Sequence, residues 1–405
     1  MALTYRRIAE DEYPAFVRAN EAAFSAVPSE EDVRRERTLS TIERCIVAVD
    51  GAEIVGTSDT SEMSMAVPGA EIPIGYVTSV GVKPSHRRQG IATELMRRQL
   101  VDARERGEAV SVLYASEGAI YGRFGYGLAT VGLSIDVESS RSAFVRPHRP
   151  AGTVRLVERQ MAVKDVLAVH DMVRPTRPGM VALDETRFEY SLHDHGPERD
   201  QPTFFALHEG ERGVDGYVAY RVRHRWPGGN PSWELTVRDL LGATPQAVAD
   251  LWRFVLDVDL VERVRAWSRP VDEPLLYLVA EPRRLRATLH DNLWLRPVDV
   301  AAALRARRYA AGGRVVLEVH DAFCTWNDGR YELEADGEGD AVVTRTSTQP
   351  DLACSAGELG AVYLGGSSLR QLHRAGRVDE LRPGGLARAD GLFAWDPAPW
   401  CPYDF

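Results

Sequence analysis

A chain of 405 residues is long enough for two or three domains, and its 44% hydrophobic content can supply each with a buried core. Its formal net charge of -10 argues against a nucleic-acid partner and favours tolerance of cationic small molecules. No apolar run approaches a membrane span, residues 1–7 lack a signal-peptide layout, and the four cysteines show neither metal-ligand spacing nor a disulfide framework. We therefore expect a cytoplasmic protein with no membrane span and no metal.

The first third of the chain predicts a strand at residues 3–8 and then an amphipathic helix that is entered at Asp11 and runs towards Phe24. A polar, charged stretch at residues 29–37 follows. Two hairpins come next, with strands at 45–49, 53–58, 63–67 and 72–80. Their turns are predicted at Asp50-Gly51 and Pro68-Gly69.

Residues 76–107, YVTSVGVKPSHRRQGIATELMRRQLVDARERG, predict a strand, a basic loop and a helix. Gly81 indicates a bulge or a close backbone approach, and Pro84 ends the strand because it has no N–H to donate. Apolar residues recur at helical spacing from Ile91, and Gly107 is typical of a helix C-terminus. The loop at residues 86–90 should therefore precede a helix N-terminus.

A helix N-terminus exposes unpaired N–H groups and the positive end of a dipole, so this loop is a candidate anion site. Gly90 and Ala92 are small enough to let a phosphate approach, which favours a pyrophosphate ligand. The alternative is a basic surface turn before an amphipathic helix.

The pattern resembles the acetyl-CoA motif of the GNAT acetyltransferases, R/Q-x-x-G-x-G/A, which Arg87, Gly90 and Ala92 match. The resemblance implies that the loop and helix start bind the pyrophosphate, with Arg88 and Thr93 in the set. It also implies that Val80 and Val82 on the preceding strand pair with the pantetheine arm.

Residues 112–127, VLYASEGAIYGRFGYG, resemble the strand and helix that flank the cofactor thiol in that family. Tyr121 matches the tyrosine that protonates the departing thiolate, and its phenol, with a reference pKa of about 10, is protonated at neutral pH. Ser116 is a candidate cofactor contact or a capping residue. We expect Tyr126 to be a packing aromatic. The backbone N–H of Val80, at the predicted bulge, could stabilise the thioester oxygen.

The resemblance covers residues 1–150 and implies a catalytic GNAT domain. Residues 151–296 echo its strand and helix pattern but have only GATP ahead of the helix at 246–256, so we read either a second, degenerate GNAT-like domain or an unrelated α/β domain. Residues 297–405 resemble a sterol-carrier-protein-type domain, with a helix at 300–307, strands at 313–321, 329–335 and 341–346, and helices at 356–364 and 367–375. The expected fold class is thus α/β (α+β), with tandem GNAT folds before a sterol-carrier-like domain.

This domain series is similar to the enhanced intracellular survival family. In that family the carboxylate of a terminal phenylalanine is the catalytic base, which implies this role for Phe405. Asp404 and Phe24 match acceptor-binding positions. The chain departs from the family at Ala26 and Glu36, where an acid and a tryptophan are expected; Glu30, Glu31 or Asp32 could supply the charge. The family also implies a homohexamer.

The expected function is transfer of acetyl from acetyl-CoA to primary amines of polycationic molecules through a ternary complex. Aminoglycosides, polyamines and lysine side chains of peptides remain open as acceptors. The alternatives are a non-catalytic acyl-CoA- or lipid-binding protein and an N-acyltransferase that uses a longer acyl-CoA.

Overall fold

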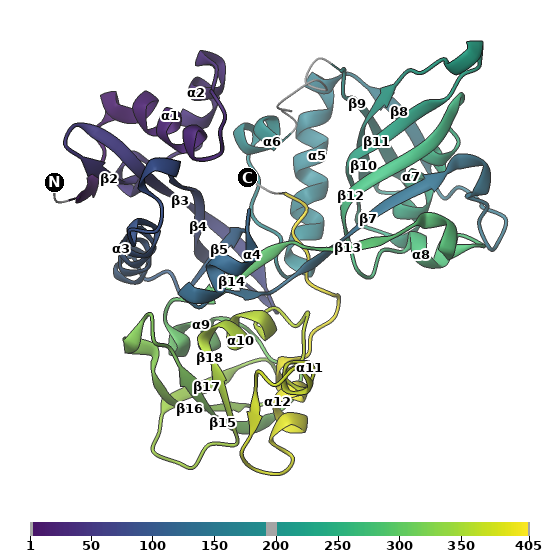
Figure 1. Ribbon diagram of the computed structural model, residues 1–405. Coiled ribbons are helices and arrows are strands. Elements are labelled where there is room, and N and C mark those ends of the chain that lie inside the picture. Colours follow the sequence, from purple (N-terminus) through teal and green to yellow (C-terminus); the bar gives the residue numbers. More distant parts are fainter. Residues whose placement is uncertain (1–2, 192–200, 404–405) are drawn as a thin grey trace. The chain divides into compact units, whose positions relative to one another are not determined.

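The computed structural model describes residues 3–191 and 201–403, and its contacts divide the chain into two compact units (Figure 1). The first unit holds residues 3–130 and 293–396, and the second holds 131–292 and 397–403 in so far as they are described. The first unit contains two sheets and the second contains one. The expected mixed α/β class is confirmed.

The first sheet has seven strands in the order β1-β2-β3-β4-β5-β14-β6. Their bounds are Thr4–Arg7 (β1), Ile46–Asp50 (β2), Glu53–Val67 (β3), Ala70–Val82 (β4), Val110–Tyr114 (β5), Leu293–Pro297 (β14) and Gly127–Leu128 (β6). Strand β14 comes from far along the chain and pairs antiparallel with both β5 and β6. The first sheet is therefore completed by a strand that follows residues 131–292 of the second unit in sequence.

The two strands predicted at residues 53–58 and 63–67 are one continuous strand, β3, so that prediction is wrong in its division. The polar run between them, Thr57–Ser61, is buried, and β3 pairs with β4 along this stretch, which satisfies its backbone groups. The predicted turn at Pro68-Gly69 is confirmed, because β4 begins directly after it.

Helices cover both faces of the first sheet. They are Tyr13–Ala23 (α1), Glu30–Arg37 (α2), Ile91–Glu105 (α3) and Gly118–Tyr121 (α4), with α1 and α3 on opposite faces (Figure 1). The polar stretch at residues 29–37 is thus mostly helical. Ser29 and Asp32 form its capping box, in which the Ser29 side chain accepts from the Asp32 N–H.

The other sheet of the first unit has the order β17-β16-β15-β18-β19. Its strands are Ala341–Arg345 (β17), Gly329–Ala335 (β16), Gly313–His320 (β15), Leu352–Ser355 (β18) and Asp379–Glu380 (β19). Its helices are Val300–Ala306 (α9), Ala356–Val362 (α10), Leu369–Arg374 (α11) and Gly385–Phe393 (α12). The expected strands and helices of this region are confirmed to within two residues or so at each end.

The second unit is built on a seven-stranded sheet with the order β13-β7-β12-β11-β10-β9-β8. Its strands are Thr288–Asp291 (β13), Val131–Glu138 (β7), Val261–Pro270 (β12), Trp233–Gly242 (β11), Gly213–Arg223 (β10), Phe204–Gly210 (β9) and Thr153–Val157 (β8). Helices Arg159–Val173 (α5), Glu185–Ser191 (α6), Pro245–Leu256 (α7) and Leu275–Leu278 (α8) complete it. The chain order β10, β11, α7, β12 repeats the order β3, β4, α3, β5 of the first sheet, with β11 and β12 parallel as β4 and β5 are.

The start of α7 differs from the start of α3 in its chemistry. Thr244 caps α7 by accepting from the Ala247 N–H, and Pro245 occupies the first helical position. Thr244 also donates to the Asp215 carboxylate over 3.2 Å. A carboxylate beside this N-terminus disfavours a second anion, so the helix start is closed to a phosphate.

No helix among residues 3–191 and 201–403 is long and apolar enough to cross a membrane.

His170 on α5 makes the stability of the second unit depend on pH. It is fully buried, and burial lowers its pKa from 6.5 to about 4. The folded state therefore binds this proton less readily than the unfolded chain, and stability falls as pH drops from 6.5 towards 4. We expect the free energy of unfolding, measured by urea denaturation, to be about 2 kcal/mol lower at pH 5 than at pH 7 because of this one group.

The control for this prediction is His170→Leu, which removes the titrating group. Its free energy of unfolding should fall less between pH 7 and pH 5 than that of the unmodified protein. Equal slopes in the two proteins would contradict the prediction.

Candidate active site

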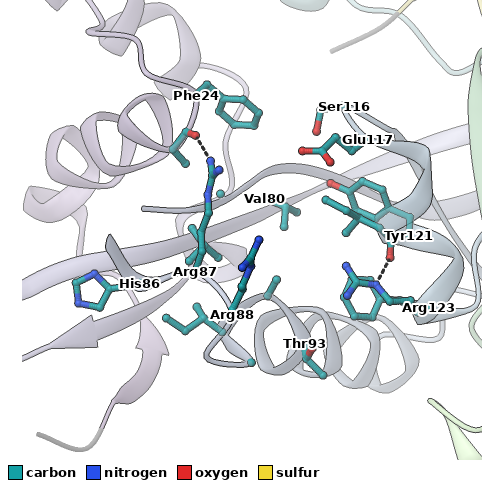
Figure 2. Close-up of a pocket in the computed structure, with 18 residues that line it drawn as sticks. Phe24, Val80, His86, Arg87, Arg88, Thr93, Ser116, Glu117, Tyr121 and Arg123 are labelled. Atoms are coloured by element: carbon teal, nitrogen blue, oxygen red, sulfur yellow. Dashed lines mark hydrogen bonds between the residues drawn. The ribbon is translucent and has the colours of Figure 1, made fainter. Parts of the chain in front are cut away.

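A pocket of about 330 Å³ opens in the first unit between the ends of β4 and α1, the start of α3, and α4 (Figure 2). The ten described residues that the sequence assigned to the cofactor, the acid and the acceptor all line it: Phe24, Val80, Val82, Arg87, Arg88, Gly90, Ala92, Thr93, Ser116 and Tyr121. Glu30, Glu31 and Asp32, named as alternative sources of charge, do not line it. Asp404 and Phe405, the other two nominated residues, lie outside the described part of the chain.

The pocket exists because β4 and β5 stop pairing. Their parallel register includes Gly75 with Ser111 and Tyr76 with Val112, and in the described structure it extends no further. Beyond this point β4 bulges against β3, since Thr78 opposes Asp59 while Gly81 opposes Thr57. The strand end that reaches the pocket is therefore free of β5.

The bulge lies at Ser79 and Val80, so of the two alternatives predicted for Gly81, a bulge or a close approach, the second applies. Ser79 takes a positive φ of 51°, and its carbonyl accepts from the Thr57 hydroxyl at 2.9 Å. Gly81 is needed for close approach instead. A Cβ there would stand 2.9 Å from Asn20 Oδ1 and 3.0 Å from Ala23 Cβ on α1.

The basic loop joins this strand to α3. Arg88 has a φ of 63° and Gly90, the N-cap of α3, has a φ of 81°, so two left-handed residues turn the chain into the helix. A Cβ added to Gly90 would meet nothing within 4 Å. The space in front of the helix N-terminus is thus open.

The two arginines of the loop lie in different surroundings. Arg87 Nη2 donates to the Ala23 carbonyl at 2.9 Å and so ties the loop to the end of α1 (Figure 2). Arg88 lines the pocket and is exposed. Arg88 is therefore the better placed of the two to meet an anionic ligand.

Tyr121 closes the opposite wall. Tyr121 is only 6% exposed, and burial raises the pKa of its phenol above the ordinary value of 10. A hydrogen bond with Ser116 opposes the rise, whereas the charge of Glu117 adds to it. Ser116 does not cap α4, because Glu117 is the N-cap residue and makes no side-chain cap bond.

Tyr126 is held differently. It is buried, with its hydroxyl 2.7 Å from Ser111 Oγ, and its ring meets the Tyr121 ring edge-on at 6.2 Å. As the sequence indicated, it packs in the core; it does not line the pocket.

The turn after Tyr121 is fixed by the sterol-carrier-like part of the same unit. Arg296 on β14 donates to the Phe124 carbonyl and, at 2.5 Å, to the Asp321 carboxylate. Phe323 lies 5.2 Å from Phe124 between ring centroids. Both charged residues are almost fully buried, so this ion pair depends on its partners remaining in place.

Sequence reasoning missed three polar residues of the pocket: His86, Glu117 and Arg123. Glu117 and Arg123 flank Tyr121 within the quoted motif, and His86 begins the basic loop, so their positions beside nominated residues were the available signal. Arg123 Nε donates to the Ile120 carbonyl at 3.3 Å (Figure 2). Within the described residues no group of three His, Cys, Asp or Glu side chains is placed to hold a metal ion.

Comparison with known families finds three regions in the chain. Family models described as acetyltransferase (GNAT) domain match residues 4–129 and 179–297, and one described as sterol carrier protein domain matches residues 300–402. The tandem GNAT folds and the sterol-carrier-like domain are thereby confirmed. The GNAT matches also imply acetyl-CoA as the acetyl donor.

Full-length relatives point the same way. An uncharacterized N-acetyltransferase of Streptomyces avermitilis is 41% identical over 413 residues, covering 100% of both chains. N-acetyltransferase Eis of Mycobacterium bovis is 32% identical over 425 residues, also with 100% of each chain covered.

Among solved structures, the chain is similar to Eis1 from Mycobacterium abscessus, with a TM-score of 0.86, 31% identity and 100% of both chains covered. Together with the pocket geometry, these findings show that the chain belongs to the Eis family of GNAT N-acetyltransferases.

Proposed function

We propose that this enzyme transfers acetyl from acetyl-CoA directly to primary amines of polycationic acceptors, within a ternary complex. The observation that supports the proposal most strongly is the arrangement of one pocket. An open helix N-terminus with Arg88 lies on one wall, and the buried phenol of Tyr121 lies on the other.

The first wall fits the phosphates of a coenzyme A thioester. A helix of 15 residues presents its free N–H groups there, and a pyrophosphate could approach Gly90 because nothing fills the space beside it. Arg88, Ala92 and Thr93 would border the phosphates, and the β4 end at Val80 and Val82 would pair with the pantetheine arm. When bound, the thioester supplies an activated acetyl group.

Transfer of that group forms a C–N bond and breaks a C–S bond, so the amine loses a proton and the thiolate gains one. Tyr121 is protonated at neutral pH, since its pKa is raised above 10. Donation to a thiolate whose conjugate acid titrates near 8.5 is therefore uphill by at least about 2 kcal/mol. Tyr121 should consequently give up its proton as the C–S bond breaks and not before.

A bulged strand can aim a backbone N–H at the thioester oxygen. Ser79 and Val80 both face Ser58 across the β3–β4 ladder, so one of them is surplus to the regular pairing. We assign the Val80 N–H to the oxygen that gains negative charge during attack.

The carboxylate of Phe405 is our candidate for receiving the proton of the amine. An α-carboxylate titrates near 3.5 and an alkylammonium near 10, so direct transfer from one to the other is uphill by roughly 9 kcal/mol. The carboxylate could position the amine while water takes the proton. Alternatively, the site could raise the pKa of the carboxylate or lower the pKa of the amine until direct transfer becomes feasible. Asp404 would add a second negative charge for a cationic acceptor.

Acidic side chains near the end of α1 support a cationic acceptor. Burial raises the pKa of Glu36 to about 7, and the charges of Glu21, Asp32 and Asp59 contribute. Glu21 lies on α1, three residues before Phe24, the pocket residue that caps the C-terminus of this helix. A bound ammonium group would relieve this crowding of negative charge, so the chain has its own acids here in place of the acid and tryptophan expected at Ala26 and Glu36.

The first test is release of free thiol from acetyl-CoA with a panel of amines, using protein that ends at its native Phe405. The panel holds a polyamine, several aminoglycosides and a lysine peptide. We expect turnover with at least one polycation and a weaker response to a monoamine. Acetyl-CoA binding by calorimetry without turnover on any amine would instead favour an acyl-CoA-binding protein.

Arg88→Glu reverses the charge that faces the proposed phosphate position. We expect the acetyl-CoA dissociation constant from calorimetry to rise roughly ten- to hundredfold, or about 1.4–2.7 kcal/mol. Arg141→Glu makes the same change in net charge at an exposed residue of the second unit and should leave the constant unchanged. An unaltered constant in Arg88→Glu would remove the loop from the cofactor site.

Tyr121→Phe should lower kcat by about 10²-fold or more, because a general acid contributes 10²–10⁴-fold, and should leave acetyl-CoA affinity unchanged. Tyr126→Phe is the matched control. It deletes a neighbouring hydroxyl bonded to Ser111 and should cost about 1–2 kcal/mol of stability while kcat stays near the unmodified value. Similar kcat values for the two variants would exclude Tyr121 as the acid.

A further inference from the structure

The C-terminal tail, residues 397–403, is buried in the second unit, although the sterol-carrier match at residues 300–402 includes most of it. Residues 397–403 belong to this unit, and Trp400, Cys401 and Tyr403 are each 5% exposed or less. A specific set of contacts must hold a segment that is buried to this extent.

The tail binds where two parallel strands part. The β11–β12 register ends at Val237 with Ala266, and β11 then bulges at Arg238, since Val237 opposes Tyr220 while Asp239 opposes Ala219. On β12 the register with β7 shifts between Ala266 and Arg269. This place corresponds to the gap between β4 and β5 that forms the pocket of the first unit.

One end of the tail bonds to β12. Trp400 Nε1 donates to the Ser268 carbonyl at 2.6 Å, and Ser268 has a φ of 54° within the β12 irregularity. The Arg269 guanidinium lies 5.0 Å from the centre of the Trp400 ring. The Asn292 amide donates to the Cys401 carbonyl at 3.1 Å and to Ser268 Oγ at 2.8 Å.

The other end bonds to β11. The Tyr403 hydroxyl donates to Asp239 Oδ2 at 2.9 Å, and the Tyr217 hydroxyl donates to the same oxygen at 2.5 Å. Burial raises the pKa of Asp239, and the two hydroxyls and Arg269 oppose this rise. The ring of Tyr403 also lies 5.6 Å from that of the buried His170 on α5.

We infer that the second GNAT-like domain is a binding site for the chain's own C-terminal peptide, in which Asp239 and Tyr403 are positioning residues for acetyl transfer. The gap that takes a cofactor in one domain would take the tail in the other. Tyr403 directly precedes Asp404 in sequence, so under this inference its hydrogen bond would limit the reach of the residues that follow it. The effect on turnover rests on the proposed role of Phe405, whereas the binding of the tail does not.

The experiment compares Tyr403→Phe with Tyr217→Phe in the full chain. Each variant removes one hydroxyl from Asp239 and also the 3.2 Å contact between the two hydroxyls, but only Tyr403→Phe removes the bond from the tail to Asp239. We measure release of phenylalanine by carboxypeptidase A, kcat and KM with the best amine of the panel, the acetyl-CoA dissociation constant, and the urea midpoint.

For Tyr403→Phe we expect carboxypeptidase release to be at least threefold faster and kcat to fall about tenfold, with the acetyl-CoA dissociation constant unchanged. Tyr217→Phe should shift the urea midpoint comparably but change release and kcat less than twofold. Asp239→Asn, which keeps the shape of the side chain and removes its charge, should behave as Tyr403→Phe does.

Wild-type release and kcat in Tyr403→Phe would overturn the inference, as would equal effects of the two tyrosine variants. Faster release with an unchanged kcat would keep the tail site and reject its positioning role. If the unmodified protein acetylates no amine, the proposed function fails, and carboxypeptidase release still decides whether the tail is held by Tyr403.

Discussion

The early end of pairing between two parallel strands is the constraint on which the rest of this protein depends. In the first unit, β4 and β5 lose their register after Tyr76 and Val112, and the bulge at Ser79 and Val80 bends β4 away. Backbone groups released in this way must find partners elsewhere. The amide groups of a coenzyme A thioester could supply such partners, which is why we place the proposed cofactor site at this break in the sheet.

The same break occurs in the second unit with another solution. Between β11 and β12 the tail occupies the break, where Trp400 bonds to the Ser268 carbonyl of β12 and Tyr403 bonds to the Asp239 side chain of β11. The helix starts differ in the same sense. Gly90 leaves the N-terminus of α3 open. At the N-terminus of α7, by contrast, Thr244 caps a free N–H group, Pro245 has no N–H to offer, and the carboxylate of Asp215 would repel an anion. Two related folds can therefore serve a cofactor and a peptide with few changes.

Buried ion pairs connect the catalytic domain to segments distant in sequence. Arg296, which follows the second unit, and Asp321, in the sterol-carrier-like domain, hold the turn that succeeds Tyr121. Arg44 and Glu108 form a comparable buried pair between the start of β2 and the start of β5. Such pairs add little net stability but penalise any arrangement that separates them, so they favour a single geometry of the site. The pocket thus depends on residues well outside the first 130.

The sequence by itself determined the motif-bearing part of the site. Helical spacing from Ile91, the small residues Gly90 and Ala92, and the tyrosine at 121 are local patterns. Local patterns predict these elements correctly because the loop and the helix are each formed by contiguous residues. For this reason the ten nominated residues that the structure describes line one pocket. The strand boundaries were less secure, because a buried polar run such as Thr57–Ser61 looks like a turn until its partner strand is known.

Only the tertiary structure decided which distant segments complete each unit. Strand β14 joins the first sheet, β7 joins the second, and residues 397–403 pack in the second unit. Nothing in the sequence of the tail identified Asp239 or Ser268 as its partners. Pairing across more than a hundred residues is chosen by burial and by the satisfaction of backbone groups in the whole fold, and no local pattern encodes it.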